Sequence, residues 1–241
     1  ILPSMGKSRQ TLSNVEMSTI AKDNFHYRSK VIIRILTMVY AGLTIITTLA
    51  LKQSGMTWFD AATHAMSLCS TCGFSTKNAS VAFWDSPAIE GIIMGAMTVS
   101  AIHFGILYAT ITGRRNNIFR SEVVRTFIGM MLVITIVIAF SLWSGDIYPT
   151  LGESFRHSAF QVVSITTTTG FATADTNLWT PLAIALLVLC SVISGCAGST
   201  SGGMKVDRVL IATKVIRQRM KLQLHPNAVI RIKVDGLVQD E

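Results

Sequence analysis

Two short runs of hydroxyl side chains, each followed by glycine and phenylalanine, are the part of this sequence best suited to bind an ion. They read SLCSTCGFST at residues 67–76 and SITTTTGFAT at residues 164–173, and five of the ten positions are identical at an offset of 97 residues. Glycine permits backbone angles that point successive carbonyls the same way. Carbonyls aimed at one axis can replace the water shell of a cation. The repeated run therefore predicts two strands of a cation filter.

The elements that would position these runs are two helix-like segments, residues 57–70 and 150–166, each of which leads into a run. A short helix ending at mid-membrane directs its negative C-terminal end at the following loop. Polar re-entrant loops packed for structural reasons are the alternative, but two copies at matching places favour a filter. The residues expected to line it are Ser70, Thr71, Cys72, Gly73 and Phe74, followed in the second run by Thr167, Thr168, Thr169, Gly170 and Phe171.

The composition indicates a membrane protein. Half of the residues (50%) are hydrophobic and 14% are charged, whereas a soluble domain carries about a quarter charged residues. Apolar stretches occupy residues 31–51, 88–112, 127–143 and 181–194. A membrane-spanning helix needs about 20 residues, so the last stretch, which ends at a glycine-rich segment, is too short to cross without interruption.

The positions of the charges predict an orientation. The net charge is +8, and the basic residues gather at 22–34, 114–125 and 205–221, while the opposite loops are mostly acidic. Basic loops stay on the cytoplasmic side, so both repeated runs would open to the outside. The basic excess then reflects topology and an attraction to anionic lipid, and nucleic acid is not an expected partner.

A glycine-rich segment, GCAGSTSGGMK at residues 195–205, interrupts the fourth apolar stretch. Broken helices of this kind form binding or gating sites in transporters. A static kink is one alternative. A phosphate-binding loop is another, but the lysine comes one place late and the segment follows an apolar helix instead of a strand. The predicted gate residues are Gly195, Cys196, Ala197, Gly198, Ser199, Thr200, Ser201, Gly202 and Gly203.

The cysteines and histidines suggest weaker alternatives. Cys69 and Cys72 form a C-x-x-C pair, which can bind zinc or carry redox chemistry, but a structural zinc site needs four ligands. A membrane enzyme with a cysteine nucleophile would need His64 as its base, and a purely structural scaffold would tolerate serine at either filter glycine. The duplicated run argues against both, and we expect no enzyme. We expect His64 and His157 to make local contacts and His103 to be an ordinary hydrogen-bonded histidine.

Four motifs carry a family resemblance: CGFST at 72–76, TTTTGFAT at 166–173, GCAGSTSGGMKV at 195–206 and HPNAV at 225–229. With them the chain resembles the Trk/Ktr/HKT superfamily of potassium transporters, most closely the Trk-type bacterial membrane subunit. The resemblance implies an all-α integral membrane fold of repeated helix–pore helix–filter loop–helix units, potassium-channel-like, with a broken last helix. In that family four such units surround one pore. The chain resembles the second and third units, so we expect it to be a fragment.

The resemblance also implies a function. Potassium would be the substrate, because Gly73 and Gly170 occupy the key filter positions, and the loop at 195–203 would be a gate. Cys72 departs from the small residue that relatives often carry beside the filter glycine. The family implies no tightly bound cofactor, a homodimer, and a cytoplasmic regulatory subunit that binds NAD or ATP and docks near 205–233. It implies the bacterial inner membrane, with the start and end of the chain cytoplasmic.

The expected organisation follows from these assignments. A cytoplasmic N-terminal segment (residues 1–30) precedes the first repeat (31–112). A cytoplasmic linker (113–126) leads to the second repeat with its intramembrane loop (127–222), and a cytoplasmic tail (223–241) follows.

Overall fold

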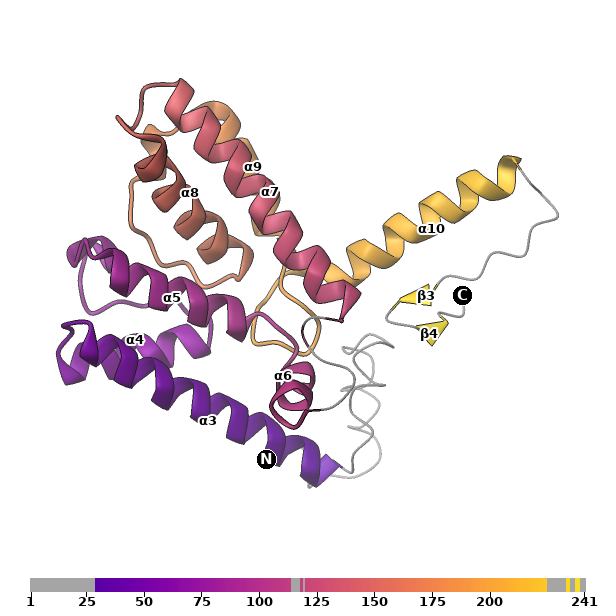
Figure 1. Cartoon of the computed structure of the whole chain (residues 1–241), viewed down its shortest axis with the longest axis horizontal. Helices are drawn as coiled ribbons and strands as arrows, with labels where there is room; N and C mark the ends of the chain where they lie inside the picture. The colour runs from indigo at the N-terminus through magenta and orange to yellow at the C-terminus, as the bar shows by residue number, and fades with distance from the viewer. Residues whose placement is uncertain (1–28, 114–117, 119, 225–232, 235–236, 239–241) are drawn as a thin grey trace.

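The computed structural model describes residues 29–113, 118, 120–224, 233–234 and 237–238. The predicted N-terminal segment, most of the predicted tail and the HPNAV motif lie outside the described residues. The regular secondary structure of the described residues is helical apart from two small sheets of two strands each. The helices form two successive groups that correspond to the two sequence repeats (Figure 1).

The first unit places a short helix between two longer elements. Its helices α3, α4 and α5 pack against one another, and α6 follows the C-terminal end of α5 (Figure 1). The elements are α3 (Ser29–Gln53), α4 (Trp58–Cys69), η2 (Ser80–Phe83), α5 (Pro87–Ser100) and α6 (Phe104–Ile111).

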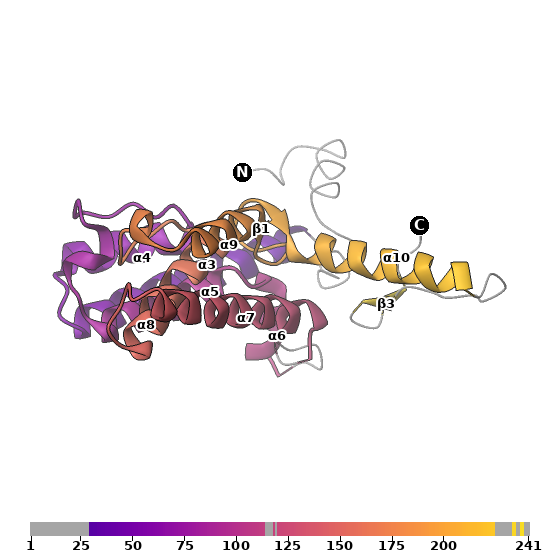
Figure 2. The ribbon, with the colours of Figure 1, turned by 90° about the horizontal axis from the view of Figure 1, so that it is seen from above.

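The second unit repeats this order. Helices α7, α8 and α9 pack together, whereas α10 extends away from both units (Figure 2). The elements are α7 (Glu122–Ser144), α8 (Leu151–Thr166), η3 (Thr176–Leu178), α9 (Pro181–Val192), β1 (Ile193–Ser194), β2 (Met204–Lys205) and α10 (Val206–Leu224), followed by the β3 (Lys233–Val234) and β4 (Leu237–Val238) hairpin. Helix α7 begins inside the predicted linker at 113–126.

Local sequence explains where the two short helices begin. Thr57 caps α4 by accepting a hydrogen bond from the Asp60 amide at 3.1 Å, and Thr150 caps α8 by accepting one from the Glu153 amide at 3.2 Å. A threonine cap with an acidic residue three places later satisfies free amides and complements the positive helix end. The short helix of each repeat therefore begins with the same kind of N-cap.

Within the residues that the structure describes, two helices are long and apolar enough to cross a membrane, namely α3 from residue 33 onward and α7. The second apolar stretch, predicted as one span at 88–112, instead forms α5 and α6, which are bent by 103° at a short break. His103 Nδ1 accepts a hydrogen bond from the Gly105 amide at 2.8 Å and so caps α6, as an ordinary hydrogen-bonded histidine would. The 12-residue helix α9 is apolar but short, as predicted for the interrupted fourth stretch.

The two units share a hydrophobic core. One buried cluster contains Leu51, Leu68 and Ile93 of the first unit, and Phe160 and Phe171 of the second unit are buried in the same cluster. The second unit thus supplies side chains that the first unit needs to fill its interior.

An ion pair also joins the units near the N-terminal ends of α5 and α8. The Arg156 guanidinium on α8 donates two hydrogen bonds to the Glu90 carboxylate on α5, at 2.7 and 2.8 Å, and a third to Asp85 at 2.9 Å. Glu90 is only 2% exposed. A carboxylate buried this deeply requires a charged partner, and the guanidinium group of arginine can form the bidentate pair that suits it.

We predict that Arg156→Gln destabilises the protein by about 3–5 kcal/mol, because it leaves Glu90 buried without its partner. The loss is measured as a lower thermal unfolding temperature in detergent. The double variant Arg156→Gln/Glu90→Gln removes the orphaned charge and recovers part of the loss. Equal unfolding temperatures for the wild type and Arg156→Gln would contradict this role.

Candidate ion filter and gate loop

Both repeated runs begin where a short helix ends. Helix α4 ends at Cys69 and α8 ends at Thr166, which are equivalent positions at the 97-residue offset. The next residues, Ser70 and Thr167, cap these helices in nearly the same conformation, with φ and ψ of −85° and 0° in the first and −80° and 0° in the second. Each run therefore receives the negative end of a helix dipole.

The backbone of the two runs is also equivalent. The φ angle is positive at Thr71 (51°) and Gly73 (70°) in the first run, and at Thr168 (56°) and Gly170 (89°) in the second. The residue between each pair does not have a positive φ. Side chains and carbonyls of an ordinary strand alternate between two sides, whereas alternating signs of φ can turn successive carbonyls to one side. This is the backbone that a carbonyl filter requires.

The two runs lie close together. A Cβ atom added to Gly73 would come within 2.0 Å of the Thr169 carbonyl oxygen, whereas one added to Gly170 would meet no atom within 4 Å. The segment after the second run is tied to the first unit, because the Ala172 amide donates to Ser80 Oγ at 3.2 Å and the Ala82 amide donates to the Ala172 carbonyl at 3.2 Å.

The predicted filter residues differ in burial between the repeats. In the second run Thr167, Thr169 and Phe171 are buried, with Phe171 only 1% exposed. In the first run Phe74 is 79% exposed, although it is the sequence equivalent of Phe171. The other members are half-buried (Ser70, Thr71, Gly73 and Thr168) or exposed (Cys72 and Gly170). The structure thus brings all ten predicted residues into two adjacent segments. It buries three of the five residues of the second run and none of the five of the first.

The predicted gate loop lies directly against both runs. Strands β1 and β2 pair in parallel and join the two ends of the loop, with Ile193 opposite Met204. The Gly202 amide donates a hydrogen bond to Thr168 Oγ1 at 2.8 Å. Thr71 shares its hydroxyl proton between the Ser70 carbonyl at 2.8 Å and the Thr200 carbonyl of the loop at 3.0 Å. Equivalent threonines of the two repeats therefore hold one loop.

The break between α5 and α6 contacts the other side of the loop. The Cys196 amide donates to the Ala101 carbonyl at 2.9 Å, and the Phe104 amide donates to the Gly198 carbonyl at 3.2 Å. A Cβ atom on Gly198, whose φ is +76°, would lie 2.7 Å from the His103 ring. The break is absent from the sequence prediction, and its only local signal is a histidine followed two places later by glycine within an apolar stretch.

Two residues beyond the loop also hold it. Asp207 Oδ1 accepts a hydrogen bond from the Ala197 amide at 2.9 Å, and Lys205 Nζ donates to Ser201 through both the hydroxyl and the carbonyl oxygen. Ser199 Oγ lies 2.8 Å from Ser201 Oγ. The start of α10 is therefore connected to the loop that touches both runs.

The geometry does not favour a cysteine enzyme. Cys69 is buried and Cys72 is exposed, and both are free thiols. The His64 ring, the base that such an enzyme would need, lies 2.7 Å from the Asp60 carbonyl through Nδ1 and 2.9 Å from Ser75 Oγ through Nε2. Both ring nitrogens are thus engaged by groups other than the thiols.

Comparisons with known proteins are consistent with this arrangement. Residues 1–238 match the family model of TrkH, described as a cation transport protein. The chain is 38% identical over 237 residues to the Trk system potassium uptake protein TrkH of Salmonella typhimurium, an alignment that covers 97% of this chain and 49% of that protein. It is 32% identical over 240 residues to the Trk system potassium uptake protein TrkG of Escherichia coli, covering 99% of this chain and 49% of that protein.

A solved structure agrees as well. The crystal structure of the potassium transporter TrkH from Vibrio parahaemolyticus matches with a TM-score of 0.80 and 36% sequence identity, over 84% of this chain and 44% of that chain. This likeness confirms the all-α, repeated pore-unit fold predicted from the sequence. The chain spans about half the length of the curated relatives that it matches.

We predict that Gly73→Ala destabilises the protein more than Gly170→Ala. Both variants carry the cost of about 1–2 kcal/mol for a left-handed residue with a side chain, but only the Gly73 variant also collides with a backbone oxygen. Thermal unfolding of the two purified variants measures the difference. Equal unfolding temperatures would mean that the two runs do not lie this close together.

Proposed function

Because the chain belongs to the TrkH family of cation transport proteins, we propose that it is the pore-forming part of a Trk-type potassium uptake system, with a backbone-carbonyl filter and a gating loop. One observation carries the proposal. The two repeated runs have matching φ angles and follow matching helix ends, so both present the same backbone to the same place.

The family assignment agrees with the resemblance found in the sequence. It identifies the chain as part of a membrane transport protein and not as an enzyme. The apolar helices α3 and α7 fit a membrane location.

In the proposed mechanism, a potassium ion loses its water against the carbonyls of residues 70–74 and 167–171. The C-terminal ends of α4 and α8 add a negative potential at that position. The ion then passes the loop at 195–203 and leaves on the cytoplasmic side, driven by its electrochemical gradient. The names of the relatives, which are potassium uptake proteins, and the glycine in both runs support potassium as the substrate.

The pore requires more than this chain. Phe171 is covered by the neighbouring unit, whereas its equivalent Phe74 is exposed. We expect a further unit to cover Phe74 in the same way. Since the curated relatives are about twice as long, the remaining units would come from the rest of a longer protein, and the whole would surround the axis with four filter strands.

The loop at 195–203 is proposed as the gate. Hydrogen bonds from Thr71 and to Thr168 hold it beneath both runs, where it obstructs the path. Its connection through Asp207 to α10 offers a route by which a cytoplasmic event can move it.

The proposed location is the bacterial inner membrane, with both chain ends cytoplasmic. The basic residues of α10, which follow the loop directly, support this orientation. They also form a surface suited to a cytoplasmic regulatory subunit that binds NAD or ATP. A homodimer of membrane subunits, potassium as the transported ion and no tightly bound cofactor complete the proposal.

Ion uptake into vesicles tests the filter. The full-length protein should take up rubidium in competition with potassium and should discriminate against sodium. Gly170→Ser should lower the ratio of rubidium to sodium uptake by about tenfold or more, because serine disfavours the positive φ of a filter residue. Gly152→Ser, at an open position in the first turn of α8, is the matched control. Unchanged selectivity in the Gly170 variant would make the second run a structural loop.

Removing the threonine contact tests the gate. Thr168→Val keeps the shape of the side chain but cannot accept the hydrogen bond from the Gly202 amide. Losing this bond costs about 1 kcal/mol, which lowers the ratio of closed to open protein by about fivefold. We expect higher basal rubidium uptake.

Thr168→Ser keeps the hydroxyl group and should behave like the wild type. If the valine and serine variants have the same basal uptake as the wild type, the contact does not hold a gate.

A further inference from the structure

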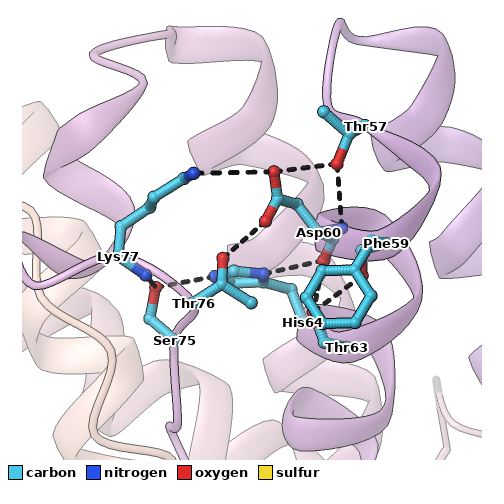
Figure 3. Close-up of polar contacts among 8 residues, drawn as sticks. All are labelled: Thr57, Phe59, Asp60, Thr63, His64, Ser75, Thr76 and Lys77. Carbon is cyan, nitrogen blue, oxygen red and sulfur yellow. Dashed lines mark hydrogen bonds and ion pairs between the residues drawn. The ribbon is translucent and has the colours of Figure 1, made fainter.

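His64 lies behind the first filter run and is fully buried, with 0% exposure. Figure 3 shows it on α4, reaching across to Ser75 near the end of the run. Its Nδ1 atom lies 2.7 Å from the Asp60 carbonyl and its Nε2 atom lies 2.9 Å from Ser75 Oγ. The ring therefore bridges the short helix and the outer end of the filter strand.

The partners determine where the protons lie. A carbonyl can only accept, so Nδ1 donates to Asp60. In the neutral ring Nε2 is then an acceptor and accepts a hydrogen bond from the Ser75 hydroxyl. Ser75 Oγ is left free to accept the Lys77 amide, which lies at 3.1 Å. The three bonds form one consistent chain from the helix to the strand.

Asp60 holds the next residues of the same strand (Figure 3). Its carboxylate accepts hydrogen bonds from Thr76 Oγ1 at 2.6 Å and Thr57 Oγ1 at 2.9 Å, and Lys77 Nζ lies 4.0 Å away. The bond from Thr76, and secondarily that from Thr57, lowers the pKa of the Asp60 carboxyl. The whole segment directly after Phe74 is thus attached to α4.

The same histidine contacts the second run. Its ring stacks on Phe171 with a centroid distance of 5.6 Å and an interplanar angle of 18°, and Trp84 meets it edge-on at 5.1 Å. Phe171 belongs to the other repeat and its carbonyl accepts from Ser164 Oγ at 2.6 Å. His64 is therefore in contact with the outer part of both filter strands.

The second repeat has an equivalent of His64. At the 97-residue offset the counterpart is Gln161, which is also buried and donates from Nε2 to the Ala174 carbonyl at 3.1 Å. Ala174 is itself the counterpart of Lys77. In each repeat one polar side chain of the short helix reaches the segment that follows the glycine and phenylalanine.

We propose that His64 is a positioning residue for ion selection, which fixes the distance between the two filter strands by holding Ser75 of one and packing on Phe171 of the other. The inference rests on the proposed function of the runs as a filter. It adds a specific cause for their spacing, namely a buried side chain that contacts both strands.

Three variants of the full-length protein separate the contacts. His64→Gln takes the residue of the other repeat and keeps an acceptor near the Nε2 position. His64→Asn keeps a donor near Nδ1 but does not reach Ser75. Ser75→Ala removes the hydroxyl from the opposite side. His157→Gln is the matched control, because it makes the same substitution on the other short helix, where the His157 ring stacks on Tyr148 at 4.9 Å.

The measurements are the ratio of rubidium to sodium uptake into vesicles and the unfolding temperature of each purified variant. We expect His64→Asn and Ser75→Ala to lower the uptake ratio by about threefold to tenfold, the range of one net hydrogen bond. His64→Gln should recover most of the ratio, and His157→Gln should retain it.

The inference is overturned if His64→Asn and Ser75→Ala both keep the wild-type ratio. It is also overturned if His64→Gln loses as much selectivity as His64→Asn, since a structural role alone would then account for the effect. A wild-type protein that takes up no potassium-competable rubidium would instead refute the proposed function. The two failures are therefore distinguishable within the same assay.

Discussion

Irregular backbone at membrane depth must be satisfied by the protein itself, because hydrocarbon offers no hydrogen-bond partners. Three irregular segments meet in this structure: the runs at 70–76 and 167–173 and the loop at 195–203. They satisfy one another in part, through the contact of Gly202 with Thr168. The break at 101–103 and the start of α10 supply further partners for the loop. The loop proposed as the gate therefore also supplies hydrogen-bond partners to the two runs whose path it would close.

Duplication accounts for the equivalence of the runs, and divergence accounts for how the repeats fit together. The threonine caps, the helix ends and the positive φ angles are the same in both units. The contacts between the units are not. Arg156 of the second unit pairs with Glu90 of the first, and Phe171 of the second stacks on His64 of the first. Such one-way contacts give the two units a fixed order around the proposed axis.

The sequence predicts the features that depend on local chemistry. Hydropathy locates α3 and α7, and the repeated run locates both candidate filter strands. It does not predict the bend between α5 and α6, because the partners that satisfy the broken backbone come from Cys196 and Gly198, far along the chain. The sequence also does not predict the Arg156–Glu90 pair, although Glu90 is an isolated acid in an apolar stretch and such residues require a partner. The role of His64 depends on how the strand after Phe74 turns back toward α4, which the order of residues alone does not specify.

The proposed function requires that the two repeated runs line one ion path. The most direct test is a crystal structure of the full-length protein grown with rubidium, with anomalous diffraction used to locate the ion. We expect an anomalous peak on an axis bordered by the backbone carbonyls of residues 70–73 and 167–170. Ordered rubidium found only elsewhere, with these carbonyls facing away from any ion, would contradict it.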